Sequence, residues 1–185
     1  MIISRRAIIA AAAVTAVTHR SMAAGPVDAW QFEMPSIDEG VLRFADYRGK
    51  VLLVANTASY CGYTYQYKQL EALHRDMSSK GLSVIGIPSQ DFGQEKDSNA
   101  EVKAFCELTY GVEFPMAALS HVRGGSAVPF YQWVKAERHW EPRWNFFKVL
   151  IGRDGRIIDT FSSDDEPDRG ALRSAIDAAV ARPVT

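Results

Sequence analysis

The chain of 185 residues is 47% hydrophobic and carries a net charge of −1, a balance typical of one globular domain with a complete core. Because positive and negative residues are mixed along it, neither a nucleic-acid groove nor an anionic membrane surface is indicated as a partner. No run approaches the roughly 20 apolar residues of a membrane-spanning helix, so no stable membrane insertion is expected. The four histidines are too scattered to predict a metal site.

The first 24 residues have a different composition from the rest. They begin with the basic pair Arg5-Arg6, continue with an apolar run rich in Ala and Val, and end with small residues around Ser21-Met22-Ala23. This order is typical of a signal peptide, and the arginine pair resembles a twin-arginine signal, although a general-export signal also fits. We expect residues 1–24 to direct export to a bacterial periplasm and residues 25–185 to form a single domain.

The first half of that domain predicts a β-hairpin followed by two buried strands with a helix between them. Alternating segments flank a Pro-Ser-Ile-Asp-Glu-Gly turn, which is typical of a hairpin. Two continuous apolar runs are typical of strands buried on both faces, and apolar residues at helical spacing lie between them. The predicted elements are hairpin strands at 30–34 and 41–44, buried strands at 51–56 and 82–87, and a helix over 65–79 that stops before Gly81.

The second half predicts further helices and a second hairpin. Ser98 or Asn99 can cap a helix that ends before Phe114-Pro115. The segment Gly152-Arg153-Asp154-Gly155 separates two alternating segments, which is a strong hairpin signal. The predicted elements are helices over 100–109, 128–137 and 168–181, and strands over 146–151 and 156–161.

This order of elements predicts an α/β protein with the thioredoxin-like fold. Two strands joined through a helix pair in parallel by the right-handed crossover rule, and the terminal hairpin adds antiparallel strands. The expected architecture is therefore a central mixed β-sheet flanked by helices on both faces, with a β-hairpin at the N-terminus.

One of the two cysteines, Cys61, follows the first buried strand at the turn into its helix. Unpaired N–H groups and the helix dipole favour a thiolate at such a position, which indicates a reactive cysteine. Thr64 stands where a C-x-x-C motif would place its second cysteine, and this argues against simple dithiol exchange. A buried inert thiol, or a structural disulfide with Cys106 in an exported protein, remains the alternative.

The segment around Cys61 closely resembles the glutathione peroxidase family. Residues 49–64 read GKVLLVANTASYCGYT and are followed by Gln66-Tyr67, as around the catalytic cysteine or selenocysteine of that family. Further blocks agree in order and spacing, and the similarity runs from about Phe32 to the end of the chain. These blocks are residues 88–95 with 98–99, residues 105–106 through 110–115, and residues 143–148 with 153–155.

The resemblance implies a thiol peroxidase that needs no cofactor and no metal. The Cys61 thiolate would attack hydrogen peroxide or an organic hydroperoxide, release water or an alcohol, and become a sulfenic acid. Trp144 and Asn145 correspond to the active-site Trp and Asn of the family, whose N–H groups can bond the thiolate and polarise the peroxide. Without the resemblance, this pair would be interpreted as a core Trp and a turn-forming Asn.

Cys106 matches the resolving cysteine of two-cysteine members of the family. It would condense with the sulfenic acid to form a Cys61–Cys106 disulfide, which a thioredoxin-like protein or another thiol such as glutathione would reduce. Because the two cysteines lie on different predicted helices, local unwinding would have to bring them together. We therefore expect the helix of Cys106, or the loop that enters it, to be mobile.

The loop after the second buried strand departs from the family pattern. The family commonly has P-x-N-Q-F there, and its Gln is the fourth member of the active site. This chain has Asp91 at the Gln position and Gln90 at the Asn position, and the loop is one residue shorter before Gln94-Glu95. A carboxylate near Cys61 would oppose the thiolate. Either Asp91 is held neutral or bonded elsewhere, or Gln90 replaces it.

The span over 130–144 is too short for an insertion resembling the assembly loop of the tetrameric, glutathione-using members. With Cys106, this favours a monomer or loose dimer reduced by a thioredoxin-like donor. The expected role is defence against oxidative stress, through reduction of hydroperoxides. A peroxide sensor that passes its disulfide to a partner protein is the alternative, because the same two cysteines would serve it.

Overall fold

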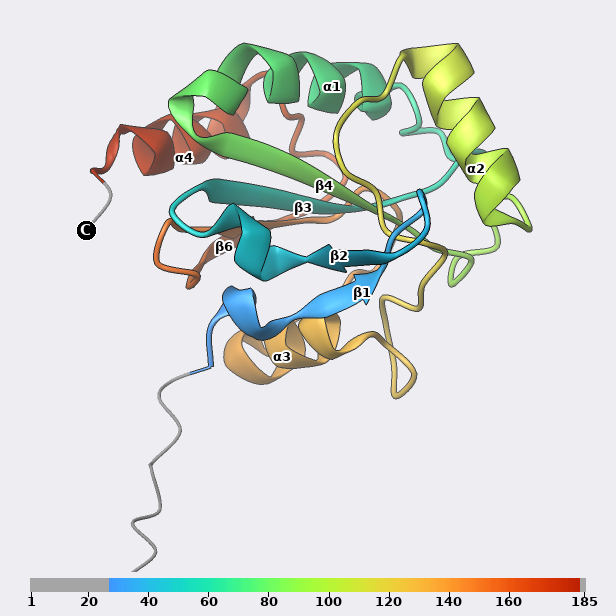
Figure 1. Cartoon of the computed structure of the whole chain (residues 1–185), viewed down its shortest axis with the longest axis horizontal. Coiled ribbons are helices and arrows are strands. Elements are labelled where there is room, and N and C mark those ends of the chain that lie inside the picture. Colours follow the sequence, from blue (N-terminus) through green and yellow to red (C-terminus); the bar gives the residue numbers. More distant parts are fainter. Residues whose placement is uncertain (1–26, 184–185) are drawn as a thin grey trace, which may run out of the picture.

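The computed structural model describes residues 27–183, which form a four-stranded mixed sheet with helices on both faces and a separate two-stranded sheet (Figure 1). The strand order is β4-β3-β5-β6. The predicted signal, residues 1–24, lies outside the described residues. None of the helices among these residues has the length and hydrophobicity of a transmembrane span. The predicted thioredoxin-like architecture is confirmed.

The centre of the sheet is formed by two parallel strands. β3 (Val51–Thr57) and β4 (Leu82–Pro88) are buried along their whole length, as their continuous apolar sequences predict. The helix α1 (Gln66–Met77) connects them, and Gly81 with φ of 92° ends the helical segment before β4.

The remaining strands are antiparallel. β5 (Lys148–Ile151) pairs with β3 on one side and with β6 (Ile157–Phe161) on the other. The N-terminal hairpin consists of β1 (Glu33–Pro35) and β2 (Val41–Arg43). Because β3 and β4 are parallel, their carboxyl ends lie next to each other, and the loops that follow them meet at one end of the sheet.

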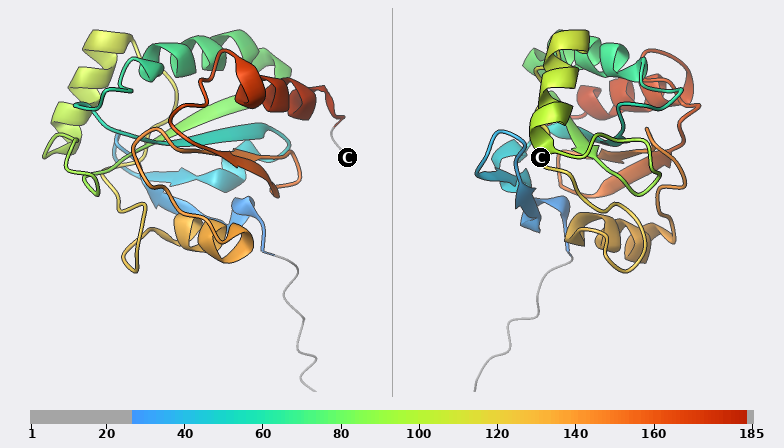
Figure 2. Two further views of the ribbon diagram at one scale, coloured as in Figure 1. Left: turned by 180° about the vertical axis from the view of Figure 1, so that it is seen from behind. Right: turned by 90° about the vertical axis from the view of Figure 1, so that its right-hand side faces the viewer.

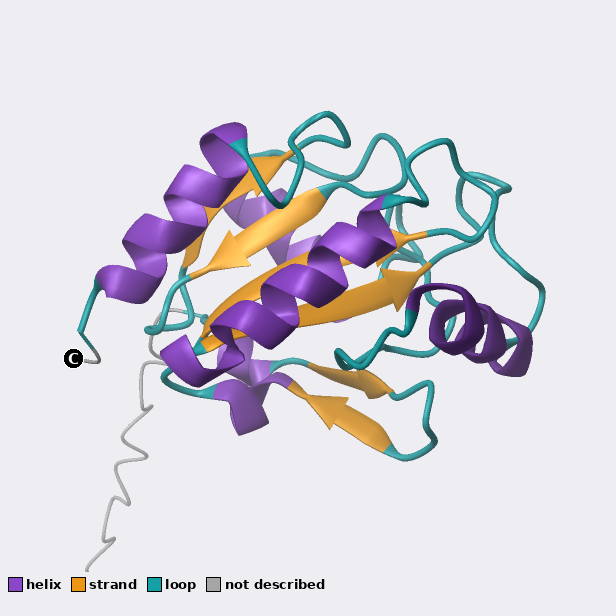
Figure 3. Cartoon of the chain, turned by 90° about the horizontal axis from the view of Figure 1, so that it is seen from above, coloured by secondary structure: helices purple, strands orange, loops and turns teal. Residues whose placement is uncertain are grey.

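Helices cover the two faces of the sheet unequally (Figures 2 and 3). α1 and α4 (Gly170–Ala181) lie on one face, and α2 (Asn99–Phe105) stands at the end of the sheet. The three helices share a core with side chains of β3 and β4. α3 (Pro129–Arg138) and the β1–β2 hairpin cover the other face with a second core. Cys61 and Cys106 both belong to the core on the α1 side.

Two elements differ from the sequence-based expectation in ways that affect the candidate site. The predicted helix over 100–109 is α-helical only to Phe105 and continues as a π-helix over Cys106–Tyr110, which Gly111 ends with φ of 63°. π-Helical turns are uncommon and are frequent at functional sites. β5 begins two residues later than predicted because Phe146 has φ of 61°, which a regular strand cannot contain.

Candidate active site

Cys61 lies in the loop between β3 and α1, but not directly at the helix N-terminus. The α-helix begins at Gln66, and the intervening residues form successive turns. Cys61 is 8% exposed, and the N–H of Tyr63 points at its sulfur with a nitrogen-to-sulfur distance of 3.5 Å. The donor facing the sulfur is therefore a backbone N–H of the turn, and not one from the first turn of α1.

The residues around Cys61 fix its backbone and leave space beside it. The N–H of Cys61 donates to the hydroxyl of Thr64 at 3.0 Å, and that hydroxyl donates to the carbonyl of Cys61 at 2.7 Å or of Ala58 at 3.0 Å. Thr64 thus stabilises the turn rather than the sulfur. A Cβ added at Gly62 would meet no heavy atom within 4 Å, so the approach to the turn is open there.

Asn145 is connected to the Cys61 loop through Gln94. The Asn145 side chain is fully buried, and its amide Nδ2 donates to Oε1 of Gln94 at 2.9 Å. The backbone carbonyl of Gln94 accepts from the N–H of Tyr60, the residue before Cys61, at 2.9 Å. Gln94 is therefore bonded to both the Asn145 carboxamide and the loop of Cys61. The sequence did not identify Gln94 as a site residue.

Trp144 is the exposed member of the candidate site. The residue is 40% exposed, and its ring packs against Phe92 with centroids 5.5 Å apart. Its backbone carbonyl accepts from Nδ2 of Asn56 at the end of β3. The indole is thus anchored at the same end of the sheet from which the Cys61 loop leaves.

Asp91 is hydrogen-bonded away from the Cys61 loop. Its Oδ1 contacts Nδ1 of His121 at 2.6 Å, and its Oδ2 accepts from the N–H groups of Val122 and Arg123 at 2.7 and 3.2 Å. Partial burial opposes the charge, but these bonds from His121 and the two amides give a net lowering of the Asp91 pKa. Asp91 is therefore ionised, and its carboxylate holds residues 121–123 in place. This is one of the outcomes expected from the sequence, in which Asp91 is hydrogen-bonded away from Cys61.

Gln90 is hydrogen-bonded within its own loop. Its amide Nε2 donates to the carbonyls of Glu95 and Lys96 at 2.5 and 3.2 Å and to the Asp97 carboxylate. These bonds join the start of the loop after β4 to its residues 95–97. The signal that could have pointed to Gln94 is the one-residue shortening of the loop, which moves the next glutamine toward the site.

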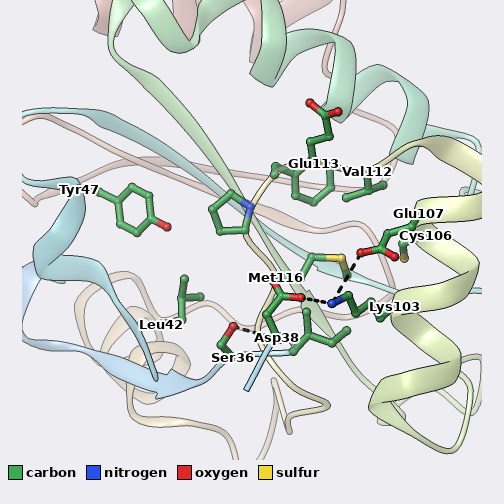
Figure 4. Close-up of a pocket in the computed structure, with 13 residues that line it drawn as sticks. Ser36, Asp38, Leu42, Tyr47, Lys103, Cys106, Glu107, Val112, Glu113 and Met116 are labelled. Atoms are coloured by element: carbon green, nitrogen blue, oxygen red, sulfur yellow. Dashed lines mark hydrogen bonds and ion pairs between the residues drawn. The ribbon is translucent and has the colours of Figure 1, made fainter. Parts of the chain in front are cut away.

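Cys106 is 1% exposed and is a free thiol, as is Cys61. Burial raises the pKa of the Cys106 thiol to about 12. The residue lines a cavity of about 530 Å³ between the β1–β2 turn, α2 and residues 112–116 (Figure 4). At its edge, Nζ of Lys103 bridges Asp38 at 2.6 Å and Glu107 at 3.8 Å. The structure thus holds Cys106 protonated.

Lys96 connects the segments that carry the two cysteines. Its ammonium lies 4.7 Å from the ring centroid of Tyr60, which precedes Cys61, and 5.3 Å from that of Phe105, which precedes Cys106. It also donates to the Tyr60 hydroxyl at 2.8 Å. The chain neighbours of the two thiols therefore lie on either side of one cation.

The segment over 162–168, here called the capping loop, packs over the start of α1. The hydroxyl of Tyr63 donates to Asp164 at 2.5 Å, and the hydroxyl of Ser163 donates to the backbone carbonyl of Asn145 at 2.6 Å. The capping loop therefore holds both the residue whose N–H faces the Cys61 sulfur and the carboxamide residue.

The fully buried Lys148 on β5 is hydrogen-bonded to the backbone of the capping loop. Nζ of Lys148 donates to the carbonyls of Ser162 and Asp165 at 3.2 and 2.6 Å. Burial lowers the pKa of Lys148 to about 7, although Asp165 opposes the shift. No carboxylate within residues 27–183 lies within ion-pair distance of it. No group of three or more possible metal ligands occurs among these residues either.

Comparison with known proteins relates this site to one family. The family model described as glutathione peroxidase matches residues 29–135, a range that includes Cys61 and Cys106. The chain is 42% identical over 130 residues to the glutathione peroxidase-like peroxiredoxin gpx1 of Schizosaccharomyces pombe, covering 68% of this chain and 82% of that protein. It is 36% identical over 148 residues to the hydroperoxy fatty acid reductase gpx1 of Synechocystis, covering 74% and 88%.

A solved structure agrees with these sequence relatives. The structure titled "Crystal structure of Trgpx in apo form" superposes with a TM-score of 0.70 at 32% identity. The superposition covers 86% of this chain and all of the other chain. The arrangement of sheet and helices that positions Cys61 is therefore shared with that protein.

Proposed function

The chain belongs to the glutathione peroxidase family and is a thiol peroxidase acting on hydroperoxides, and from this premise we propose how its residues divide the reaction. Cys61 is the nucleophile. Its sulfur attacks the terminal peroxide oxygen and the O–O bond breaks. The other peroxide oxygen leaves as water or an alcohol, after taking up a proton equivalent to the one that the Cys61 thiol has lost. Cys61 is left as a sulfenic acid.

Three groups support this attack. The N–H of Tyr63 faces the sulfur and stabilises its negative charge before the reaction. The indole N–H of Trp144 and the carboxamide of Asn145 come from the segment next to the Cys61 loop, and they can donate to the peroxide oxygens as charge develops. Fixed donors of this kind need no reorganisation during the reaction, which is the reason they accelerate it.

Gln94 is the fourth active-site residue in this proposal, in place of Asp91 or Gln90. Its hydrogen bond to Nδ2 sets the orientation of the Asn145 carboxamide. Asp91 and Gln90 have their side-chain polar atoms engaged elsewhere. The single observation that carries the proposal is the connection from the Cys61 loop through Gln94 to Asn145.

The sulfenic acid is resolved by Cys106 and the resulting disulfide is reduced by a thioredoxin-like protein. Support comes from the position of both cysteines on the same side of the sheet and from the cation that their neighbours share. The π-helix over Cys106–Tyr110 is the segment that unwinds to bring the sulfurs together. Organic hydroperoxides are included among the substrates because a relative is named for hydroperoxy fatty acids.

The protein acts outside the cytoplasm, as a monomer or loose dimer. Export rests on the composition of residues 1–24 and on Arg5-Arg6. The oligomeric state rests on the short connection from α3 to β5. Replacing both arginines by lysine should retain a tagged protein in the cytoplasm of a bacterial host; unchanged periplasmic recovery would contradict a twin-arginine route.

Rapid-mixing kinetics tests the proposed reaction. Reduced protein should consume hydrogen peroxide in one turnover, Cys61→Ser should consume none, and Cys106→Ser should be oxidised at the wild-type rate without forming a disulfide. The Cys106→Ser protein is the matched control, since it also lacks one buried thiol. Peroxide consumption by Cys61→Ser would refute the role of Cys61.

A further inference from the structure

The buried Lys148 has no role in the reaction described so far. It lies in β5 opposite Ala55 of β3 and Phe161 of β6, and all three residues are buried. Lysine is seldom fully buried unless it is paired, and no carboxylate within residues 27–183 lies within ion-pair distance of its Nζ. Because an apolar side chain would serve the sheet as well, the amino group is explained by its contacts outside the sheet.

Those contacts hold the capping loop at two points. Nζ of Lys148 donates to the backbone carbonyl of Ser162 at 3.2 Å and to that of Asp165 at 2.6 Å. The two residues between these carbonyls are Ser163 and Asp164. Since both acceptors belong to the main chain, the lysine fixes the backbone on either side of this pair.

Ser163 and Asp164 each hold one part of the candidate active site. The hydroxyl of Ser163 donates to the backbone carbonyl of Asn145 at 2.6 Å. The Asp164 carboxylate accepts from the hydroxyl of Tyr63 at 2.5 Å, and the N–H of Tyr63 faces the sulfur of Cys61. Two chains of hydrogen bonds therefore run from the buried amino group, one to the carboxamide residue and one to the turn of the nucleophile.

We propose that Lys148 is a positioning residue of the peroxidase reaction. By holding the capping loop, it keeps the N–H of Tyr63 directed at the Cys61 sulfur and keeps the Asn145 carboxamide in place. The inference rests on the proposed roles of Cys61 and Asn145 in the reaction. Lys148 acts through the capping loop alone, and such an action is effective because a misplacement of about 1 Å can cost on the order of 100-fold in rate.

The charged groups that act on Lys148 come from the capping loop. Burial lowers the pKa of Lys148 to about 7, and the carboxylates of Asp165, Glu166 and Asp164 oppose this shift. Its neighbours in the adjacent strands are apolar. A neutral amine retains two N–H groups, one for each carbonyl, so the contact with the loop persists on both sides of this pKa.

The test measures the reactivity of Cys61 in Lys148→Met, using a Cys106→Ser parent in which Cys61 is the one remaining thiol. Methionine has a length similar to that of lysine but cannot donate to the two carbonyls. An apolar residue in place of a buried charge is often tolerated, so the variant should fold. The two measured rates are oxidation of Cys61 by hydrogen peroxide and its alkylation by iodoacetamide over a range of pH.

In Lys148→Met, oxidation of Cys61 should slow by a factor on the order of 10 to 100. The pH of half-maximal alkylation should rise by about one unit, because a hydrogen bond to the thiolate is weakened. Gln69→Ala is the matched control, since it removes bonds to Glu166 and Asp168 at the other end of the capping loop. Both of its rates should stay within about twofold of the parent.

A second set of variants breaks the two chains of hydrogen bonds without altering the buried site. Tyr63→Phe loses the bond to Asp164. Ser163→Ala loses the bond to Asn145. The combined variant should be slowed as much as Lys148→Met, and adding Lys148→Met to it should slow oxidation by no more than about a further twofold, because residues acting through the same contacts are not additive.

Unchanged oxidation and alkylation in folded Lys148→Met would overturn the proposal and leave the lysine a structural role. So would parent-like rates in the combined variant, whether or not Lys148→Met folds, multiplying effects in the triple variant, or equal slowing in Gln69→Ala. Failure of the proposed function is distinguishable, because the parent protein would then consume no peroxide, whereas the alkylation profile would still report whether Lys148 acts on the Cys61 turn.

Discussion

Replacing Gln94 by alanine tests whether this residue orients the active-site carboxamide. The substitution removes the acceptor at 2.9 Å from Nδ2 of Asn145. Oδ1 of Asn145 already has no hydrogen-bond partner among residues 27–183. The variant would leave both polar ends of a fully buried amide unsatisfied, and each such loss costs about 1–3 kcal/mol.

This cost sets the expected effect on the reaction. If the loss is expressed in the transition state, the rate constant for oxidation of Cys61 falls by roughly 5- to 150-fold, since about 1.4 kcal/mol corresponds to tenfold. The backbone carbonyl of Gln94 still accepts from Tyr60, so the Cys61 loop keeps its position. The thermal midpoint should fall only modestly.

Stopped-flow fluorescence under excess hydrogen peroxide measures this rate constant. Gln90→Ala is the control, since it removes a glutamine from the same loop whose bonds go to Glu95 and Lys96 instead. The reasoning is refuted if Gln94→Ala reacts as fast as wild type, or if Gln90→Ala loses more activity than Gln94→Ala.

Two further substitutions follow from the charged groups near the site. Asp91→Asn should leave Cys61 oxidation within about threefold of wild type, because the carboxylate contacts His121 and nearby backbone; a loss on the order of 100-fold would restore Asp91 to the reaction. Because the Asp91 pKa is lowered, the wild-type stability advantage over this variant should be present at neutral pH and shrink as pH falls below about 4, which denaturant unfolding can measure. For Lys148, whose pKa is about 7 instead of 10.5, unfolding binds protons between these values, so wild-type stability relative to Lys148→Met should increase as pH rises through that window. A flat difference across it would show that the folded lysine titrates normally.

The fold was predictable because its elements have distinct hydrophobic periods. The runs at β3 and β4 are apolar throughout and are buried throughout, and the spacing in α1 and α4 matches the faces that pack on the sheet. The π-helix after Phe105 was not predictable, because its apolar spacing is compatible with a regular helix. The late start of β5 depends on the backbone of Phe146, which the sequence pattern does not determine.

Residue types and spacing located the site only in part. Cys61 was singled out by its place after a buried strand, whereas Trp144 and Asn145 were assigned to the site through the family resemblance. The pairing of β3 with β5 brings the segments that carry them to one end of the sheet. Their catalytic roles remain predictions. Asp91 was placed by matching the loop position by position, yet its direction is set by His121, which is distant in sequence. Gln94 was missed because the sequence does not show which glutamine of the shortened loop points toward Asn145.

The most direct measurement is peptide mass spectrometry of the reduced protein after one equivalent of hydrogen peroxide. Nucleophilic attack by Cys61 followed by resolution predicts one dominant product, a peptide pair joined through Cys61 and Cys106 with the loss of two hydrogens. Unmodified Cys61 with peroxide remaining would contradict the nucleophile, and over-oxidised Cys61 beside a free Cys106 would contradict its resolution.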